Sequence, residues 1–133
     1  MPNLPKPQIQ MSDTDPEVKS YIYQQLLEFE PYVTQDTTVA VLSRDPMKMK
    51  LRYESEGRFF DANQLKNMYR IAIVLKEGET KLQAEGLHED IFEAIRLAKE
   101  KLLKKLSAIQ DSVVSNQERV DQINTALQNN QLH

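Results

Sequence analysis

The sequence contains no glycine or proline between residue 87 and residue 133. Apolar residues recur in this stretch at spacings of three and four, which is the pattern of one face of an α-helix. The repeating positions are Ile91, Ile95, Ala98, Leu102, Leu106 and Ile109. Because glycine and proline are the residues that most often interrupt a helix, the sequence predicts one long C-terminal helix with a single apolar face.

A β-hairpin is predicted directly before this helix. Residues 68–75 read MYRIAIVL, a run rich in β-branched side chains, and Gly78 follows in a short polar turn that suits a hairpin. Between Thr80 and Glu85 apolar and polar residues alternate, so the returning strand should have one buried and one solvated face. We expect this strand to end at Gly86.

The N-terminal half predicts a first helix and two further strands. Asp15 and Pro16 form a good helix start, because Asp can cap free backbone N–H groups and Pro fits the first helical position. Apolar residues then recur at helical spacing at Val18, Ile22, Leu26 and Phe29. Pro31 should end the helix near Glu30. Residues 37–42 (TTVAVL) predict a strand, and residues 9–12 a shorter one.

The predicted elements follow the order β-α-β-β-β-α. This order predicts an α+β fold in which two helices pack on one face of a mostly antiparallel sheet, with a C-terminal helical extension. The residues expected to share the core of the hairpin and the second helix are Ile71, Ile73, Leu82, Ala84, Ile91, Ile95 and Leu102.

Residues 45–67 form an excursion between two strands. Lys48, Lys50 and Arg52 alternate with apolar or aromatic residues, so we expect a strand that carries the three cations on one face, and residues 55–57 (SEG) suit a turn between two strands of a hairpin. The three cations are either a secondary RNA-binding surface or a sheet edge protected by charge.

Aromatic residues stand among these cations. Tyr53, Phe59 and Phe60 are suited to stacking on nucleic-acid bases if they are exposed. Packing in the core is the favoured interpretation of all three.

Composition excludes several classes of function. The chain has no cysteine, which rules out disulfides and thiol chemistry and fits the reducing cytoplasm. No apolar run is long enough to cross a membrane, and the first ten residues lack the apolar segment of a secretion signal. His88 has no second ligand at metal-binding spacing, and no serine stands in a catalytic pattern. We therefore expect a soluble cytoplasmic protein that is not an enzyme and binds no cofactor or metal.

The charge is segregated along the chain. The net charge is −3, yet residues 44–106 hold 14 Lys and Arg against 11 Asp and Glu, and residues 96–106 hold five basic residues and one Glu. Clustered cations on one helix suit phosphate groups. The competing interpretation is the solvated face of an amphipathic helix.

Residues 78–106 (GETKLQAEGLHEDIFEAIRLAKEKLLKKL) resemble the ribosome hibernation-promoting factor and ribosome-associated translation inhibitor family. That family has a Gly-containing hairpin, a strand that ends near Ala-Glu, an Asp, an apolar-aromatic pair, Ala-Ile, and a Lys-Leu-x-x-Arg/Lys-x-Leu helix. The matching positions are Ala84-Glu85, Asp90, Ile91-Phe92, Ala94-Ile95, and Lys101-Leu102 through Lys104 to Leu106. The first helix is similar in outline at Val18, Lys19, Tyr21 and Ile22.

The resemblance implies a ribosome-binding protein of the cytoplasmic stress response. Members bind the rRNA of the small ribosomal subunit over the decoding region, exclude mRNA and tRNA, and so inhibit translation without chemistry. On this resemblance the RNA-binding residues are Lys19, Arg96, Lys99, Lys101, Lys104 and Lys105. The chain departs from the family at Gln25 and Glu28, where basic residues are usual, and in the length of residues 45–67. Gln25, Glu28, the net negative charge and the heptad spacing of the last residues favour the alternative of a protein-interaction module that kept the fold and lost the ribosome.

The last residues continue the second helix in a heptad pattern. Leu106, Val113, Val120 and Leu127 are seven apart, and so are Leu102, Ile109, Asn116 and Ile123. Such a seam pairs with a second chain in a coiled coil; the alternatives are a seam that folds back on its own chain and a frayed tail rich in Gln and Asn. We therefore divide the chain into a ribosome-binding domain at residues 1–110 and a tail at residues 111–133, through which a homodimer can form.

Overall fold

The elements of the fold are given by a computed structural model, which describes residues 6–11 and 15–131 and, in the last helix, the side chains as far as Ser112 and those of Asp121 and Ile123. The elements are β1 (Gln8–Gln10), α1 (Pro16–Leu26), the 3₁₀ helix η1 (Leu27–Tyr32), β2 (Thr38–Arg44), the 3₁₀ helix η2 (Pro46–Met49), α2 (Lys50–Ser55), α3 (Ala62–Lys66), β3 (Tyr69–Glu77), β4 (Thr80–His88) and α4 (Ile91–Gln131). The chain divides into two compact units, residues 1–103 and 104–133.

Four strands form one sheet in the order β1-β2-β3-β4. β1 is parallel to β2, and the other two pairings are antiparallel. The β3–β4 hairpin closes where Glu77 pairs with Thr80, and Gly78 takes a φ of 60° in the turn between them. A positive φ of this kind is easily adopted only by a residue without a Cβ atom, so the predicted use of Gly78 is confirmed.

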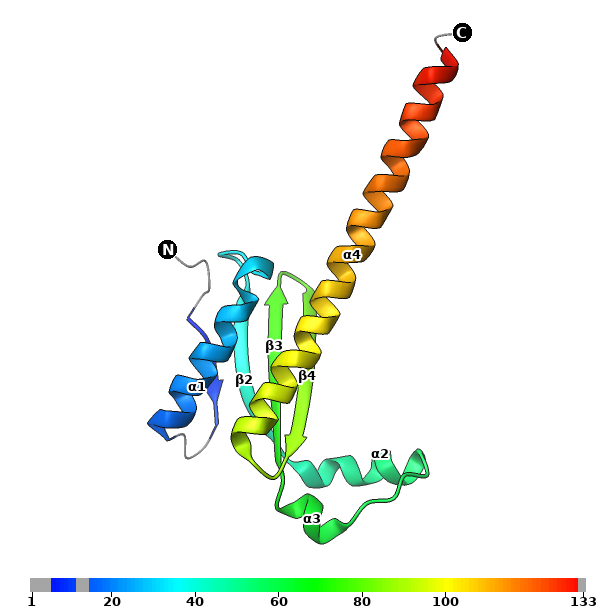
Figure 1. Ribbon diagram of the computed structural model, residues 1–133. Helices are drawn as coiled ribbons and strands as arrows, with labels where there is room; N and C mark the ends of the chain where they lie inside the picture. Colours follow the sequence, from blue (N-terminus) through cyan, green and yellow to red (C-terminus); the bar gives the residue numbers. More distant parts are fainter. Residues whose placement is uncertain (1–5, 12–14, 132–133) are drawn as a thin grey trace. The chain divides into compact units, whose positions relative to one another are not determined.

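Two helices of the first unit, α1 and the start of α4, cover the same face of the sheet (Figure 1). α1 begins as predicted, because the Asp15 carboxylate accepts a hydrogen bond of 3.0 Å from the backbone N–H of Glu17. At the start of α4 the Asp90 carboxylate accepts the backbone N–H of Phe92 in the same way, also at 3.0 Å. The two helices bury the apolar residues Val18, Ile22, Leu26, Ala94, Ile95, Ala98 and Leu102.

Gly86 sets the distance between α4 and the sheet. A Cβ atom at this position would lie 2.0 Å from the backbone oxygen of Ala94 and 2.8 Å from the backbone nitrogen of Ala98. Any side chain would therefore push the helix away from β4. The prediction that Gly86 ends the strand is wrong: β4 continues to His88, and the glycine is the point where the helix backbone touches it.

The predicted fold class is confirmed: the chain has an α+β fold with a mixed four-stranded sheet and a C-terminal helix. Ile71, Ile73 and Ala84 are buried beneath the helices as expected, while Leu82 and Ile91 are half-buried. Pro31 lies inside η1, so helical structure continues beyond Glu30 as a 3₁₀ helix. Ser12, the end of the first predicted strand, lies outside the described residues.

The strand predicted over residues 48–53 is wrong, because the excursion is helical. Asp45 caps η2 by accepting the backbone N–H of Met47 at 2.9 Å, and Pro46 occupies the first helical position. α2 follows without a break, and Asp61 caps α3 in the same manner through the N–H of Asn63. The three short helices lie beyond one end of the sheet (Figure 1).

α4 extends through the segment for which a helical tail was predicted, to Gln131. Ile109 and Ile123 are more than half exposed in the single chain. The heptad side chains Val113, Val120 and Leu127 lie outside the described residues, as does that of Asn116. No helix within residues 6–11 and 15–131 is long and apolar enough to cross a membrane.

Candidate nucleic-acid interface

Arg96, the first of the predicted RNA-binding residues on α4, is held by two carboxylates of its own helix. Its guanidinium donates to Glu93 at 3.1 Å and to Glu100 at 2.7 Å. These partners stand three residues before it and four after it, the spacings that place side chains next to one another on a helix. The hydrogen bond from Arg96 lowers the pKa of Glu93, and the two carboxylates raise the pKa of Arg96. The charge of Arg96 is thus already compensated within the protein.

Lys99 is also paired, with a residue far away in the sequence. Its Nζ atom lies 2.6 Å from Oε2 of Glu28, which belongs to η1. Only 9% of the Lys99 surface is exposed. The lysine therefore joins α4 to η1, the 3₁₀ helix that follows α1. Glu28 is one of the two positions at which the chain departs from the family that it resembles in sequence.

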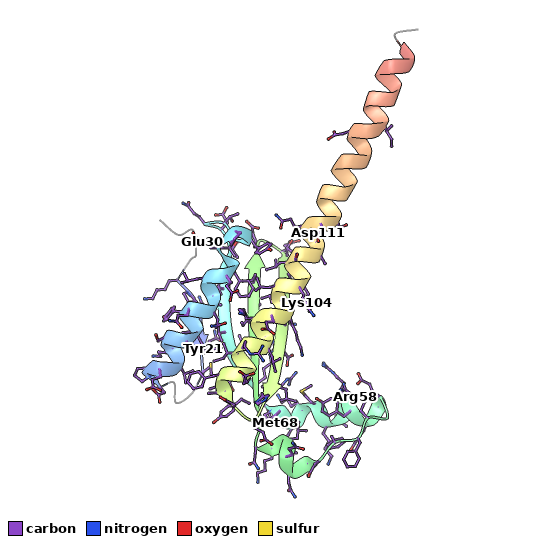
Figure 2. All side chains as sticks on the ribbon, viewed as in Figure 1. Tyr21, Glu30, Arg58, Met68, Lys104 and Asp111 are labelled. Carbon is purple, nitrogen blue, oxygen red and sulfur yellow. The ribbon has the colours of Figure 1, made fainter. Side chains whose placement is uncertain are left out.

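The remaining predicted cations are exposed. Lys19 lies on the outer side of α1, where it borders a shallow hollow together with Tyr23 and Leu27. Lys101 is exposed near the end of the first unit. Lys104 and Lys105 are exposed on α4 in the second unit, and Figure 2 labels Lys104 on that helix. These four lysines keep side chains that solvent, or a phosphate, can reach.

The secondary RNA-binding residues do not share a strand face. Lys48 lies in η2, and Lys50 and Arg52 lie in α2, so the expected alternation does not exist. Residues two apart on a helix point in different directions. All three side chains are nevertheless exposed. The excursion is therefore a charged surface of helices rather than a sheet edge.

The aromatic residues of the excursion form a cluster that is only partly buried. The Arg58 guanidinium lies 4.9 Å from the centre of the Tyr53 ring, and the centres of the Tyr53 and Phe60 rings are 5.9 Å apart. Phe59 is 98% exposed. Core packing, the favoured interpretation of all three aromatics, is therefore wrong for Phe59, while Tyr53 and Phe60 are half-buried.

The sheet face opposite the helices carries a polar network that sequence reasoning missed. Glu85 on β4 accepts hydrogen bonds from Arg70 on β3 at 3.0 Å and from Arg44 on β2 at 2.7 Å. Arg44 also donates to Gln83 at 2.9 Å. The strand register places these side chains on neighbouring strands. Alternation over residues 80–85 indicated a solvated face of β4, but the sequence contains no register from which to pair Glu85 with Arg44 and Arg70.

Comparisons with known proteins agree with this geometry at the level of the fold. No protein-family model matches the chain, and no curated protein sequence does. A solved structure of a ribosomal subunit interface protein from Coxiella burnetii is similar, with a TM-score of 0.54, 13% sequence identity, and coverage of 79% of this chain and 97% of that one. The two proteins share a fold. At this identity the likeness extends to the architecture and leaves the site residues to be argued from this chain.

Proposed function

We propose that the protein associates with the ribosome, binds the rRNA of the small subunit, and inhibits translation by occupying the decoding region. The observation that carries this proposal is the fold, which covers nearly the whole of the ribosomal subunit interface protein. The family-like residues between Ala84 and Leu106 support it independently. On this proposal the protein acts in the cytoplasm during hibernation of the ribosome, needs no cofactor, and works by blocking a site rather than by catalysis.

The exposed lysines are the residues that we expect to contact phosphate. Lys101, Lys104 and Lys105 follow one another on α4, and Lys19 lies on α1. An exposed lysine that meets a phosphate releases a condensed counterion, which favours binding and makes it dependent on salt. The charges of Arg96 and Lys99 are compensated by carboxylates, so we do not expect these two residues to bind phosphate strongly. In the proposed interface they instead orient the neighbouring carboxylates and helices.

A second function is favoured by those same ion pairs. Glu28, Glu93 and Glu100 neutralise two cations that an RNA-binding surface would use. A protein-interaction module with this fold, which no longer binds the ribosome, would have a mixed surface of this kind. The two functions differ in whether affinity for the small subunit depends on the exposed lysines.

Charge-reversal variants separate the two functions. We expect Lys101→Glu combined with Lys104→Glu and Lys105→Glu to abolish co-sedimentation with small subunits, while the circular dichroism spectrum stays that of the wild type. Lys81→Glu, at an exposed position on β4, is matched in charge change to each of the three reversals made singly, and it should keep more of the binding than any of them. Equal binding by the triple variant and the wild type would contradict the proposed RNA contact and favour the interaction module.

We also propose that residues 111–133 act as a pairing segment for a second copy of the chain. Ile109 and Ile123 stand fourteen residues apart in the heptad pattern, and both are exposed in the single chain. A coiled-coil partner would remove such side chains from water. The first part of the chain, residues 1–110, would then be the ribosome-binding domain.

A further inference from the structure

The excursion between β2 and β3 carries two large apolar side chains that do not pack in the core. Phe59 is 98% exposed and Leu51 on α2 is 76% exposed. A single exposed apolar residue is ordinary, but a fully exposed aromatic ring beside cations has the composition of a binding surface rather than of a core. The excursion has no part in the proposed contact of α4 with the ribosome.

The exposed ring of Phe59 follows directly on a cation–π contact between Arg58 and Tyr53. α2 ends at a turn in which Gly57 has a φ of 67°, and the backbone N–H of Arg58 returns to the carbonyl oxygen of Tyr53 at 2.8 Å. This turn holds the Arg58 guanidinium over the Tyr53 ring, and the Phe60 ring is tilted by 41° to that of Tyr53. Planar groups that are fixed before binding lose little conformational freedom when a further planar group stacks on them.

A hollow of about 190 Å³ opens among these residues. It is lined by Tyr53, Arg58, Phe59, Phe60, Asp61, Gln64, Leu65, Met68 and Leu87. Six of the nine lining residues are aromatic or apolar. Asp61 and Gln64 are polar, and each already makes one hydrogen bond within the protein, as the cap of α3 and as a donor to Glu89. A planar heterocycle with polar edges fits a hollow that is lined by both apolar and polar side chains.

The hollow is fixed to the sheet. Leu65 of α3 is buried, and the Arg70 guanidinium on β3 donates to the carbonyl oxygen of Asp45 at 3.2 Å. Gln64 donates to Glu89, which follows β4, at 3.3 Å. Figure 2 shows Arg58 on the excursion and Met68 where the excursion joins β3. The residues around the hollow are therefore held in place by contacts with the sheet.

The excursion as a whole carries a small excess of positive charge. Residues 45–68 contain five basic residues and four acidic ones. Asp45 and Asp61 keep their negative charges while they cap η2 and α3, and the pair of Glu56 with Arg58 at 3.4 Å compensates one cation as well as one carboxylate. Lys48 of η2 and Lys50 and Arg52 of α2 are exposed cations of the same excursion.

We propose that the excursion binds an unpaired nucleotide of single-stranded RNA, whose base stacks on Phe59 beside the Tyr53–Arg58 pair and whose phosphates meet the exposed cations. Aromatic stacking on bases combined with cations is how proteins hold single-stranded nucleic acid without reading its sequence. A protein partner would use the exposed apolar surface of Leu51 as fully as that of Phe59. This activity goes beyond the proposed contact with the small subunit and does not require it.

The test uses the full chain and a labelled ten-nucleotide oligouridylate at low salt, with a blunt RNA duplex of equal length as the second probe. The wild type should bind the single strand more tightly than the duplex. Phe59→Leu keeps the apolar bulk and removes the aromatic face, so we expect it to weaken single-strand binding by about fivefold or more. Phe59→Trp should bind as well as the wild type. Because the native chain has no tryptophan, quenching of the fluorescence of this variant by the oligonucleotide would report stacking at that position.

Leu51→Ala is the matched control, since it removes an exposed apolar side chain from the same excursion without touching an aromatic ring. It should leave the affinity unchanged. Failure of the wild type to bind the single strand, wild-type affinity in Phe59→Leu, or an equal loss in Leu51→Ala would each overturn the proposal. No ribosome is present in this assay, so its outcome is independent of co-sedimentation with the small subunit.

Discussion

Glu85 is the common acceptor of the polar network on the sheet face opposite the helices. Burial would by itself raise the pKa of its carboxyl group, but the hydrogen bonds and positive charges of Arg70 and Arg44 outweigh burial and hold that pKa below its ordinary value. The Arg70 side chain is only 10% exposed. Removing the carboxylate would therefore leave a poorly hydrated guanidinium without its main partner.

We expect Glu85→Gln to lower the free energy of unfolding at neutral pH by roughly 1.5–3 kcal/mol, the usual worth of a hydrogen bond to a charged group. The folded-state pKa of Glu85 is depressed below 4.5, so its contribution is complete above about that pH and is lost as the pH falls through the folded value. Urea unfolding measured between about pH 3 and 7 should show a steeper acid loss in the wild type than in the variant. Glu79→Gln, in the exposed hairpin turn, is the control. Parallel pH profiles for the wild type and Glu85→Gln would count against this role.

Sequence reasoning found the cations on α4 but not their partners. The carboxylates around Arg96 stand at spacings of three and four, so the pattern that would have paired them was present in the sequence. Glu28 is 71 residues from Lys99, and only the packing of η1 against α4 brings the two together. Local spacing predicts contacts within a helix, whereas contacts between elements need the fold.

At the scale of elements, the excursion shows where a local pattern misled. Alternation of cations with apolar residues predicted a strand over residues 48–53, and the structure has helices there. Asp45-Pro46 repeats the dipeptide that correctly predicted the start of α1 at Asp15-Pro16. A cap followed by proline is a physical constraint on several backbone groups, so it outweighs an alternation that spans only a few residues.

The packing of α4 on the hairpin gives a direct test of the element arrangement. Ile95 is fully buried between the helix and the sheet. We expect Ile95→Ala to lower the free energy of unfolding by about 2–5 kcal/mol, since the removed atoms leave a cavity that the surrounding core only partly fills. Leu27→Ala, at a half-exposed position of η1, should cost far less. A loss near zero for Ile95→Ala in urea unfolding would show that the helix buries a different face.

At the scale of the whole molecule, the fold followed from periodicity. Apolar residues at helical spacing predicted α1 and α4, a run rich in β-branched residues predicted β3, and alternation predicted β4. The order of these elements then predicted two helices packed on one face of a sheet. The parallel pairing of β1 with β2 was not predicted, because three residues carry too little pattern to fix a partner strand. The division of the chain at residue 110 stays a prediction.

The pairing of the tail can be tested on the molecule in solution. If residues 111–133 form a seam with a second copy, light scattering should give a dimer for the full chain and a monomer for a truncation at residue 110. A monomeric full chain at high concentration would contradict the homodimer. A truncated chain that unfolds would point instead to packing of the tail on its own chain.

Ribosome association is the central claim, and co-sedimentation with purified small subunits at low and high salt tests it most directly. We expect the wild-type chain to pellet with small subunits at low salt and to be released as salt rises, because each phosphate contact contributes a slope of roughly −0.7 to −0.9 in a plot of log affinity against log salt. Large subunits alone should retain much less of the protein. A wild-type chain that stays in the supernatant with small subunits at low salt would contradict the account.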